Sequence, residues 1–212
     1  MKKQTGFTLI ELAIVLVIIG LLLGGVLRGQ ELINSAKVKN MARDFQNVQV
    51  YVYGYQDRFK ALPGDDHAAN THIAGTVAGN GTQNGTIEGA WDTTDDADET
   101  CVFWEHVRRA GLAAGPTTVS CAANNTYQPR NADGGLIGIQ SLSTFTAITG
   151  MSGAYVVCSD GILGRFAKQL DTTLDDGVSN TGSVRIATRG AAASAGEAAP
   201  VDGNPYMVCM AF

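Results

Sequence analysis

An apolar segment near the start of the chain limits the folds open to it more than any other feature. From Phe7 to Leu27 the only polar side chains are those of Thr8 and Glu11. As a helix, at about 1.5 Å per residue, this segment would be roughly 32 Å long, enough to cross the hydrocarbon core of a bilayer. It is longer than the apolar region of about 7–15 residues in a cleavable secretory signal, and no A-x-A-like cleavage site follows it. We therefore expect a membrane anchor.

The basic residues around the segment predict its orientation. Lys2 and Lys3 precede it, and Arg28 follows it directly. An excess of basic residues before a span favours a cytoplasmic N-terminus. Everything after about residue 28 is then expected to lie outside the cytoplasm.

Glu11 places a carboxylate inside this apolar segment. Near the middle of a span a carboxylate costs about 2.5–3.5 kcal/mol on insertion scales, and such residues usually have a partner. One interpretation is that Glu11 lies close enough to the cytoplasmic end to reach water. The other is that it pairs with a cation that appears later, because a cut after Gly6 would create a new amine on Phe7.

The stretch from Lys2 to Glu11 resembles the N-terminal signature of type IV pilins and type II secretion pseudopilins. In that family a short basic leader ends in Gly, the chain is cut before Phe, and Glu stands at the fifth position after the cut. Gly6, Phe7 and Glu11 occupy those positions here. The resemblance implies that a prepilin peptidase removes residues 1–6 and methylates the amine of Phe7. It also implies that Glu11 pairs with the amine of a neighbouring subunit during filament assembly.

Small residues repeat along the apolar segment. Gly20, Gly24, Gly25 and Gly29 form two overlapping small-xxx-small patterns. Glycine costs about 1 kcal/mol relative to alanine inside a helix, and in membranes close helix–helix approach offsets that loss. We expect these positions to face other helices in a bundle; the alternative is that they face lipid.

Apolar residues continue at helical spacing beyond the anchor. They recur at intervals of 3 and 4 residues: Met41, Phe45, Val48, Val52, Tyr55 and Phe59. This spacing forms one face of an amphipathic helix, and Leu62-Pro63-Gly64 ends it. We expect one helix from residue 7 to about 60, with a transmembrane part over 7–29 and an amphipathic part over 30–61.

The remaining residues, 62–212, are expected to form an extracytoplasmic globular head. Its strands are expected near residues 136–139, 154–158, 183–188 and 206–210, and its helices over 99–110 and 162–174, after a glycine-rich loop at 64–100. Ser159-Asp160-Gly161 is expected to cap the second of these helices. The fold class is therefore α+β, with a long N-terminal helix packed on a small antiparallel sheet with short helices. The resemblance implies the same architecture.

Cysteine usage agrees with a location outside the cytoplasm. Cys101, Cys121, Cys158 and Cys209 contain no C-x-x-C, which argues against zinc-knuckle and thioredoxin sites. An even number of cysteines in an oxidising compartment favours two disulfides, for which three connectivities exist. We prefer Cys101–Cys121 and Cys158–Cys209, because each pair joins neighbours in sequence order. Free buried thiols would require a reducing compartment.

The sequence carries no motif that indicates an enzyme. Its histidines are His67, His72 and His106, and neither H-E-x-x-H nor G-x-S-x-G occurs. We expect no catalytic residues. The net charge of −5 gives no indication of nucleic-acid binding.

Calcium is the one cofactor that the acidic residues bring into consideration. A carboxylate cluster lies at Asp92, Asp95, Asp96 and Asp98, and Ca²⁺ takes six to eight oxygen ligands. The EF-hand spacing is absent, and a solvated acidic loop without a metal is the simpler interpretation.

These features favour a structural subunit of a type IV pilus-like filament. The expected partners are further copies of the chain, other pilins, the prepilin peptidase and an inner-membrane assembly platform. The precursor is expected in the inner membrane with its N-terminus in the cytoplasm, and the product in a periplasmic or extracellular filament. One alternative is a pseudopilin of a type II secretion system. Another is a membrane-anchored periplasmic binding domain that never polymerises, which would keep its leader and tolerate Glu11→Ala.

Overall fold

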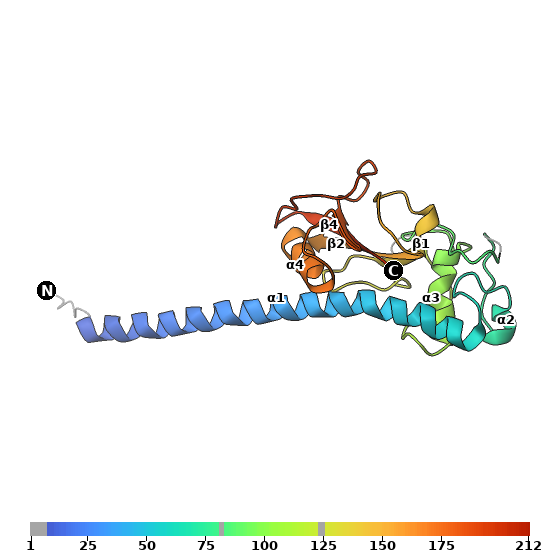
Figure 1. Cartoon of the computed structure of the whole chain (residues 1–212). Coiled ribbons are helices and arrows are strands. Elements are labelled where there is room, and N and C mark those ends of the chain that lie inside the picture. Colours follow the sequence, from blue (N-terminus) through green and yellow to red (C-terminus); the bar gives the residue numbers. More distant parts are fainter. Residues whose placement is uncertain (1–7, 81–82, 123–125) are drawn as a thin grey trace. The chain divides into compact units, whose positions relative to one another are not determined.

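The computed structural model of the chain describes residues 8–80, 83–122 and 126–212 (Figure 1). The chain divides into two compact units, an N-terminal unit up to Lys37 and a globular unit from Val38 to Phe212. In chain order the elements are α1 (Leu9–Phe59), α2 (Ala69–His72), α3 (Glu99–Arg109), β1 (Ile137–Ser141), the 3-10 helix η1 (Leu142–Thr144), β2 (Tyr155–Leu163), α4 (Gly164–Leu174), β3 (Val184–Ala187) and β4 (Pro205–Ala211). This order confirms the expected α+β class.

Helix α1 runs without a break from Leu9 to Phe59, as its sequence predicts. Within the globular unit its apolar stripe is buried: Val38, Met41, Ala42, Phe45, Val48, Val52 and Tyr55. The helix ends where Lys60 adopts a left-handed backbone conformation, with φ of 56°. Pro63, three residues further on, cannot supply the backbone N–H that a continued helix would need.

The four strands form one antiparallel sheet in the order β1-β2-β4-β3. Alternate side chains point to opposite faces of a strand. On one face, Val157, Val208 and Met210 join the residues of α1 and α4 in the main hydrophobic core. On the other face, Val156, Cys158, Met207 and Cys209 pack with Trp91 in a smaller core. Because both faces are covered, β2 and β4 appear in the sequence as nearly continuous apolar runs.

The prediction that Ser159-Asp160-Gly161 caps a helix was wrong. Strand β2 continues through these residues to Leu163, with a shift of register between Ser159 and Ile162. Gly161 has a φ of 69°, which glycine adopts without steric cost, and the bulge returns Ile162 to pairing with Tyr206. Helix α4 therefore starts later than expected, at Gly164. The apolar residues at the end of β2 and the start of α4 happen to fit helical spacing, which concealed the boundary.

Short helix α2 lies in a stretch that the sequence predicts to be loop only. Helix α3 matches the expected element within one residue. In Figure 1, α2 and α3 lie together near the end of α1 that belongs to the globular unit. The loop between α1 and α3 therefore folds against the last turns of α1.

Candidate functional site

The carboxylate that marks the N-terminal motif caps its own helix. Glu11 lies in the first turn of α1, and its Oε2 accepts hydrogen bonds of 2.8 Å from both the backbone N–H and the hydroxyl of Thr8. The Thr8 hydroxyl oxygen in turn accepts a bond from the backbone N–H of Glu11 at 3.3 Å. This is a capping box, and the T-x-x-E spacing is the sequence signal that indicates it. Gly6 and Phe7, the expected cleavage site, lie outside the described residues.

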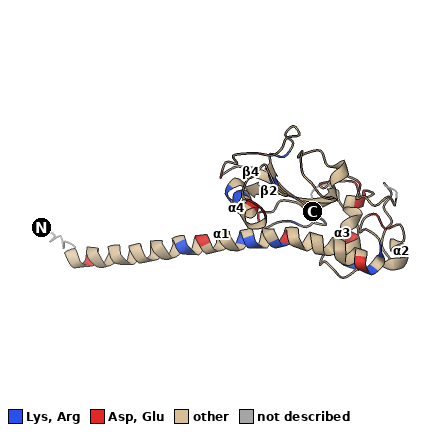
Figure 2. Cartoon of the chain, viewed as in Figure 1, with Lys and Arg blue, Asp and Glu red and all other residues tan. Residues whose placement is uncertain are grey.

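The apolar side chains of the N-terminal unit are exposed. Helix α1 is long and apolar enough to cross a membrane, and its most apolar window has a mean hydropathy of 2.8 with none of it buried. After Glu11 the next charged residue on the helix is Arg28 (Figure 2). Among the described residues, a methyl group placed on Gly20 or Gly24 would have no neighbour within 4 Å. This surface is thus available to lipid or to other helices.

A buried cluster of polar side chains attaches the C-terminal end of α1 to the loop that follows it. The hydroxyl of Tyr55 donates a hydrogen bond of 2.7 Å to Oδ2 of Asp66, and Nδ1 of His72 lies 2.7 Å from the same oxygen. The backbone N–H of Ala68 donates to Oδ1 at 2.9 Å. Burial alone would raise the pKa of Asp66, but hydrogen bonds from His72, Tyr55 and Ala68 outweigh it and lower the pKa. Asp66 therefore acts as a charged anchor between α1 and the loop that follows.

His106 fixes the neighbouring part of the same loop. Its Nδ1 accepts a hydrogen bond of 2.9 Å from the backbone N–H of Gly64, and its Nε2 lies 2.7 Å from the carbonyl oxygen of Thr76. Burial lowers the pKa of His106, which favours the neutral ring that these contacts require, with the proton on Nε2. His67 is exposed. The contacts of His72 and His106 are those of residues that position a loop.

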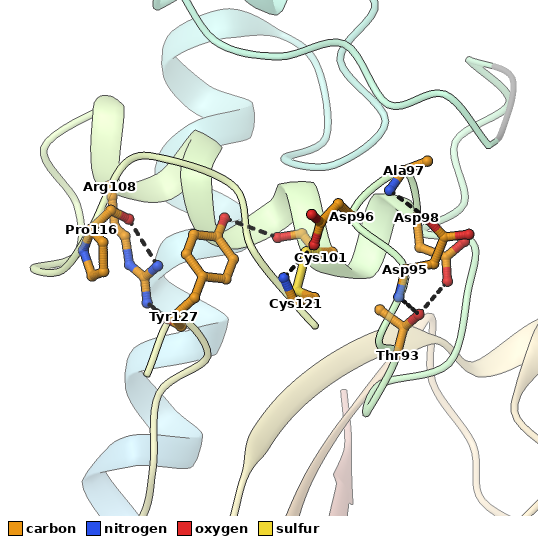
Figure 3. The surroundings of a disulfide bond; sticks show 10 residues. All are labelled: Thr93, Asp95, Asp96, Ala97, Asp98, Cys101, Arg108, Pro116, Cys121 and Tyr127. Atoms are coloured by element: carbon orange, nitrogen blue, oxygen red, sulfur yellow. Dashed lines mark hydrogen bonds between the residues drawn. A yellow bond between two sulfur atoms is a disulfide. The ribbon is translucent and has the colours of Figure 1, made fainter. Parts of the chain in front are cut away.

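The structure contains the two disulfides preferred in the sequence analysis. Cys101 of α3 is joined to Cys121, with Cα atoms 6.0 Å apart (Figure 3). Cys158 of β2 is joined to Cys209 at the paired position of β4, with Cα atoms 4.1 Å apart. The first disulfide fastens the loop after α3, and the second links two central strands.

Arg108, which the sequence analysis did not single out, holds the loop beside the first disulfide. Its guanidinium donates to the carbonyl oxygens of Pro116 and Tyr127 at 3.0 and 2.6 Å (Figure 3). The Tyr127 hydroxyl donates to the carbonyl oxygen of Cys101 at 3.2 Å. Burial lowers the pKa of Arg108, and the two carbonyl acceptors offset part of that cost.

The acidic residues considered for calcium are each engaged in a hydrogen bond or an ion pair, and the side-chain amide of Asn80 donates to both Asp95 and Asp98. Asp92 forms an ion pair of 2.6 Å with Arg189, and Asp96 accepts a hydrogen bond from the backbone N–H of Cys121. Asp95 accepts from the backbone N–H of Ala97, and Asp98 accepts from the hydroxyl of Thr93. Within the described parts of the chain, no three of these four carboxylates have oxygens within 4.8 Å of one another. Calcium binding at this loop stays a prediction.

Two buried carboxylates lie next to each other behind the loop that follows α1. Glu99 accepts a hydrogen bond on Oε2 from the backbone N–H of Glu88, and Asp65 accepts one on Oδ2 from the backbone N–H of Gly85, both at 2.8 Å. Their other oxygens are buried and have no hydrogen-bond partner in the described part of the chain. Burial, reinforced by the charge of Asp65, raises the pKa of Glu99 to about 7.

The comparison with known families bears on the first residues of the chain. Residues 1–27 match the family described as the prokaryotic N-terminal methylation motif, the prepilin motif of type IV pilins and pseudopilins. The match confirms the resemblance carried by the basic leader, the apolar segment and Glu11. No curated protein and no solved structure matches the chain.

The motif leads into one long helix, which packs on a small antiparallel sheet. The match at residues 1–27 supports a protein like the type IV pilins and pseudopilins.

Proposed function

We propose that the protein is a subunit of a type IV pilus-like filament and that it assembles through the first half of α1. The observation that carries this proposal is the prepilin motif at residues 1–27, which leads into a helix with exposed apolar side chains. Such a surface needs either lipid or other apolar helices around it. A precursor in the inner membrane has the first environment, and an assembled filament provides the second.

Proteolytic processing converts the precursor in the membrane into the subunit that assembles into the filament. A prepilin peptidase cuts between Gly6 and Phe7, and the new amine of Phe7 is methylated. The leader, with Lys2 and Lys3, stays on the cytoplasmic side of the inner membrane, and the globular unit lies outside. The two disulfides support this orientation, because disulfides persist in oxidising compartments.

Glu11 then selects the position of the incoming subunit. Its carboxylate accepts two hydrogen bonds from Thr8 through Oε2. An ionised carboxylate offers about four lone-pair sites, so acceptor capacity remains for the Phe7 amine of a neighbouring subunit. In an apolar bundle, an unpaired amine and an unpaired carboxylate are each costly, and pairing reduces both costs. The contact therefore favours one axial position of each helix against the next.

The partners follow from the same scheme. They are further copies of this chain, other pilins, the peptidase and an inner-membrane assembly platform. The globular units coat the outside of the filament. A pilus subunit is recovered from filaments sheared off the cell surface, whereas a pseudopilin stays in the cell envelope and its deletion stops secretion of folded proteins.

Substitution of Glu11 tests the proposal. Glu11→Gln is nearly isosteric and keeps an acceptor for Thr8 but removes the charge. We expect normal membrane insertion and at least about a tenfold loss from the sheared-filament fraction, as fits loss of a buried charge pair. Glu31→Gln, at an exposed position of the same helix, is the matched control and should assemble normally.

Two results would contradict the proposal. If Glu11→Gln assembles as the wild type does, the carboxylate has no role in assembly. If the wild-type protein keeps its leader and occurs in membranes alone, it is a non-polymerising anchored domain.

A further inference from the structure

Three carboxylates converge at the C-terminal end of α4. One oxygen each from Asp171, Asp175 and Asp176 lies within 4.8 Å of the others. Asp171 is buried, Asp175 is half-buried and Asp176 is exposed. The cluster is therefore closed on the side of the protein core and open to solvent on the other.

Asp171 is the unusual member of this cluster. Its side chain has an exposed fraction of 0%, and neither Oδ1 nor Oδ2 has a hydrogen-bond partner among the described residues. Buried carboxylates are normally paired, hydrogen-bonded or bound to a metal, because an unpaired buried charge is costly. Since neither oxygen has a partner, whichever one faces Asp175 and Asp176 is free to bind a ligand.

Among the described residues, no ion pair within 4.0 Å includes any of these three carboxylates. Lys168, one turn earlier on α4, forms its ion pair of 2.5 Å with Asp202 instead. Like charges this close together repel one another, and a bound cation would relieve that repulsion.

The loop between α4 and β3 holds the two outer carboxylates in place. Oδ2 of Asp175 accepts a hydrogen bond of 2.9 Å from the backbone N–H of Val184. Asp176 accepts one of 2.8 Å from the backbone N–H of Val178 and one of 3.0 Å from the hydroxyl of Thr181. Carboxylate oxygens keep a further lone pair after one such bond. The acids are thus oriented in advance and retain the capacity to coordinate.

We propose that Asp171, Asp175 and Asp176 bind a calcium ion at the junction of α4 with the loop that leads to β3. The three carboxylates supply oxygen ligands alone, which suits a hard cation and disfavours Zn²⁺, whose sites usually contain His or Cys. Calcium accepts six to eight oxygens in flexible geometry, so water at the open side can complete the shell. Mg²⁺ demands a near-ideal octahedron and sheds water reluctantly, so it fits a partly buried site less well.

The proposed ion would fasten an edge of the sheet. Among the described strands, β3 lies at an edge of the sheet and pairs with β4. On its other side the backbone N–H of Ile186 donates to the carbonyl oxygen of Ser179, in the loop after α4, at 2.9 Å, and the backbone N–H of Glu197 donates to the carbonyl oxygen of Ile186 at 2.6 Å. A cation shared by α4 and this loop would hold the start of β3 in place. Calcium would thus stabilise the part of the globular unit that the Cys158–Cys209 disulfide does not reach directly.

Thermal unfolding of the full chain in detergent, after EDTA treatment, tests the site. Millimolar CaCl2 is expected to raise the wild-type Tm by about 5 °C or more, as binding to the folded state alone requires. Asp171→Asn should abolish the shift while leaving the Tm in EDTA at or above that of the wild type, because it removes a buried charge. Should that variant not fold, Asp176→Asn, at the exposed position, should lower calcium affinity in calorimetry at least about tenfold.

Two control variants make the test specific. Glu99→Gln changes a buried carboxylate outside the cluster, and Asp95→Asn changes the acidic loop considered for calcium from the sequence; both should keep the shift. The proposal is overturned if calcium leaves the wild-type Tm unchanged, or if Asp171→Asn keeps the full shift. Loss of the shift in Asp95→Asn alone would place calcium in the acidic loop instead.

Discussion

The hydroxyl of Tyr55 donates a buried hydrogen bond of 2.7 Å to the carboxylate of Asp66. Tyr55 lies in the last turns of α1, and Asp66 follows the turn that ends it. The bond therefore connects the helix that carries the N-terminal motif to the loop that leads into the rest of the globular unit. His72 shares the same carboxylate oxygen, so the connection is a small network.

Removal of the Tyr55 hydroxyl should destabilise the globular unit. Tyr55→Phe keeps the ring but deletes one of the bonds that hold the charged Asp66. Hydrogen bonds to charged groups contribute about 1.5–3 kcal/mol, so we expect a loss of roughly 2 kcal/mol in the free energy of unfolding. Chemical denaturation of the full chain in detergent measures it.

Tyr53→Phe is the matched control, because the Tyr53 side chain is 55% exposed and on the same helix. We expect it to change stability by less than about 0.5 kcal/mol. Equal effects of the two substitutions would show that the Asp66 contact does not stabilise the fold.

The buried acid Glu99 should make stability depend on pH. Its pKa in the folded state is about 7, above the ordinary value of 4.5, so between these values the folded state binds more protons than the unfolded state. Stability from this group is present below about pH 4.5 and is lost as the pH rises through 7. The charged groups that face it, Asp65, Glu88 and Asp98, act in the same direction.

Glu99→Gln should remove this dependence. The free energy of unfolding of the variant minus that of the wild type should rise by on the order of 2 kcal/mol from pH 5 to pH 8. The reason is that the wild type loses stability as Glu99 ionises, and one pKa unit corresponds to about 1.4 kcal/mol. Denaturation of both proteins at the two pH values, in EDTA, gives the difference. An identical pH dependence in the two proteins would contradict the assignment.

The two disulfides should stabilise the fold to different extents. Their cysteines are 51 residues apart for Cys158–Cys209 and 20 apart for Cys101–Cys121. In the chain-entropy account these loops correspond to about 4 and about 3 kcal/mol. The Cys158→Ala/Cys209→Ala variant should thus lose more stability in guanidinium unfolding than Cys101→Ala/Cys121→Ala. The reverse order would contradict the loop-length argument.

The glycines of the N-terminal unit should matter for assembly and not for insertion. Gly24→Leu adds a large side chain at a position with no neighbour within 4 Å among the described residues, so the isolated chain should tolerate it. In a bundle the same side chain would prevent close helix approach. We expect normal amounts in membranes and a severalfold loss from sheared filaments, with Val26→Leu as the control. Normal assembly of Gly24→Leu would show that this glycine faces lipid or solvent.

Helical and strand periodicity made most of the fold predictable. The spacing from Met41 to Tyr55 predicts the buried face of α1, and the apolar runs at 154–158 and 206–210 predict the cores of β2 and β4. The sequence did not predict the bulge at Ser159–Gly161. The bulge depends on the pairing of Ile162 with Tyr206, which is distant in the sequence, and no local pattern indicates that pairing.

The polar clusters could not be predicted from the sequence, for a related reason. Folding of the loop after α1 brings together Tyr55, Asp66 and His72. None of these residues belongs to a sequence motif that would single it out. Asp175 and Asp176 directly follow the helix expected over 162–174, but the burial of Asp171 beside them depends on packing. Glu11 is different: its motif is local, and the sequence alone indicates its importance.

The intact mass of the protein from sheared surface filaments tests the central claim most directly. The account predicts a mass that lacks residues 1–6 and carries one additional methyl group, with both disulfides formed. The full-length precursor should occur in the membrane fraction alone. A full-length, unmethylated mass in every fraction, with no protein in sheared material, would contradict the account.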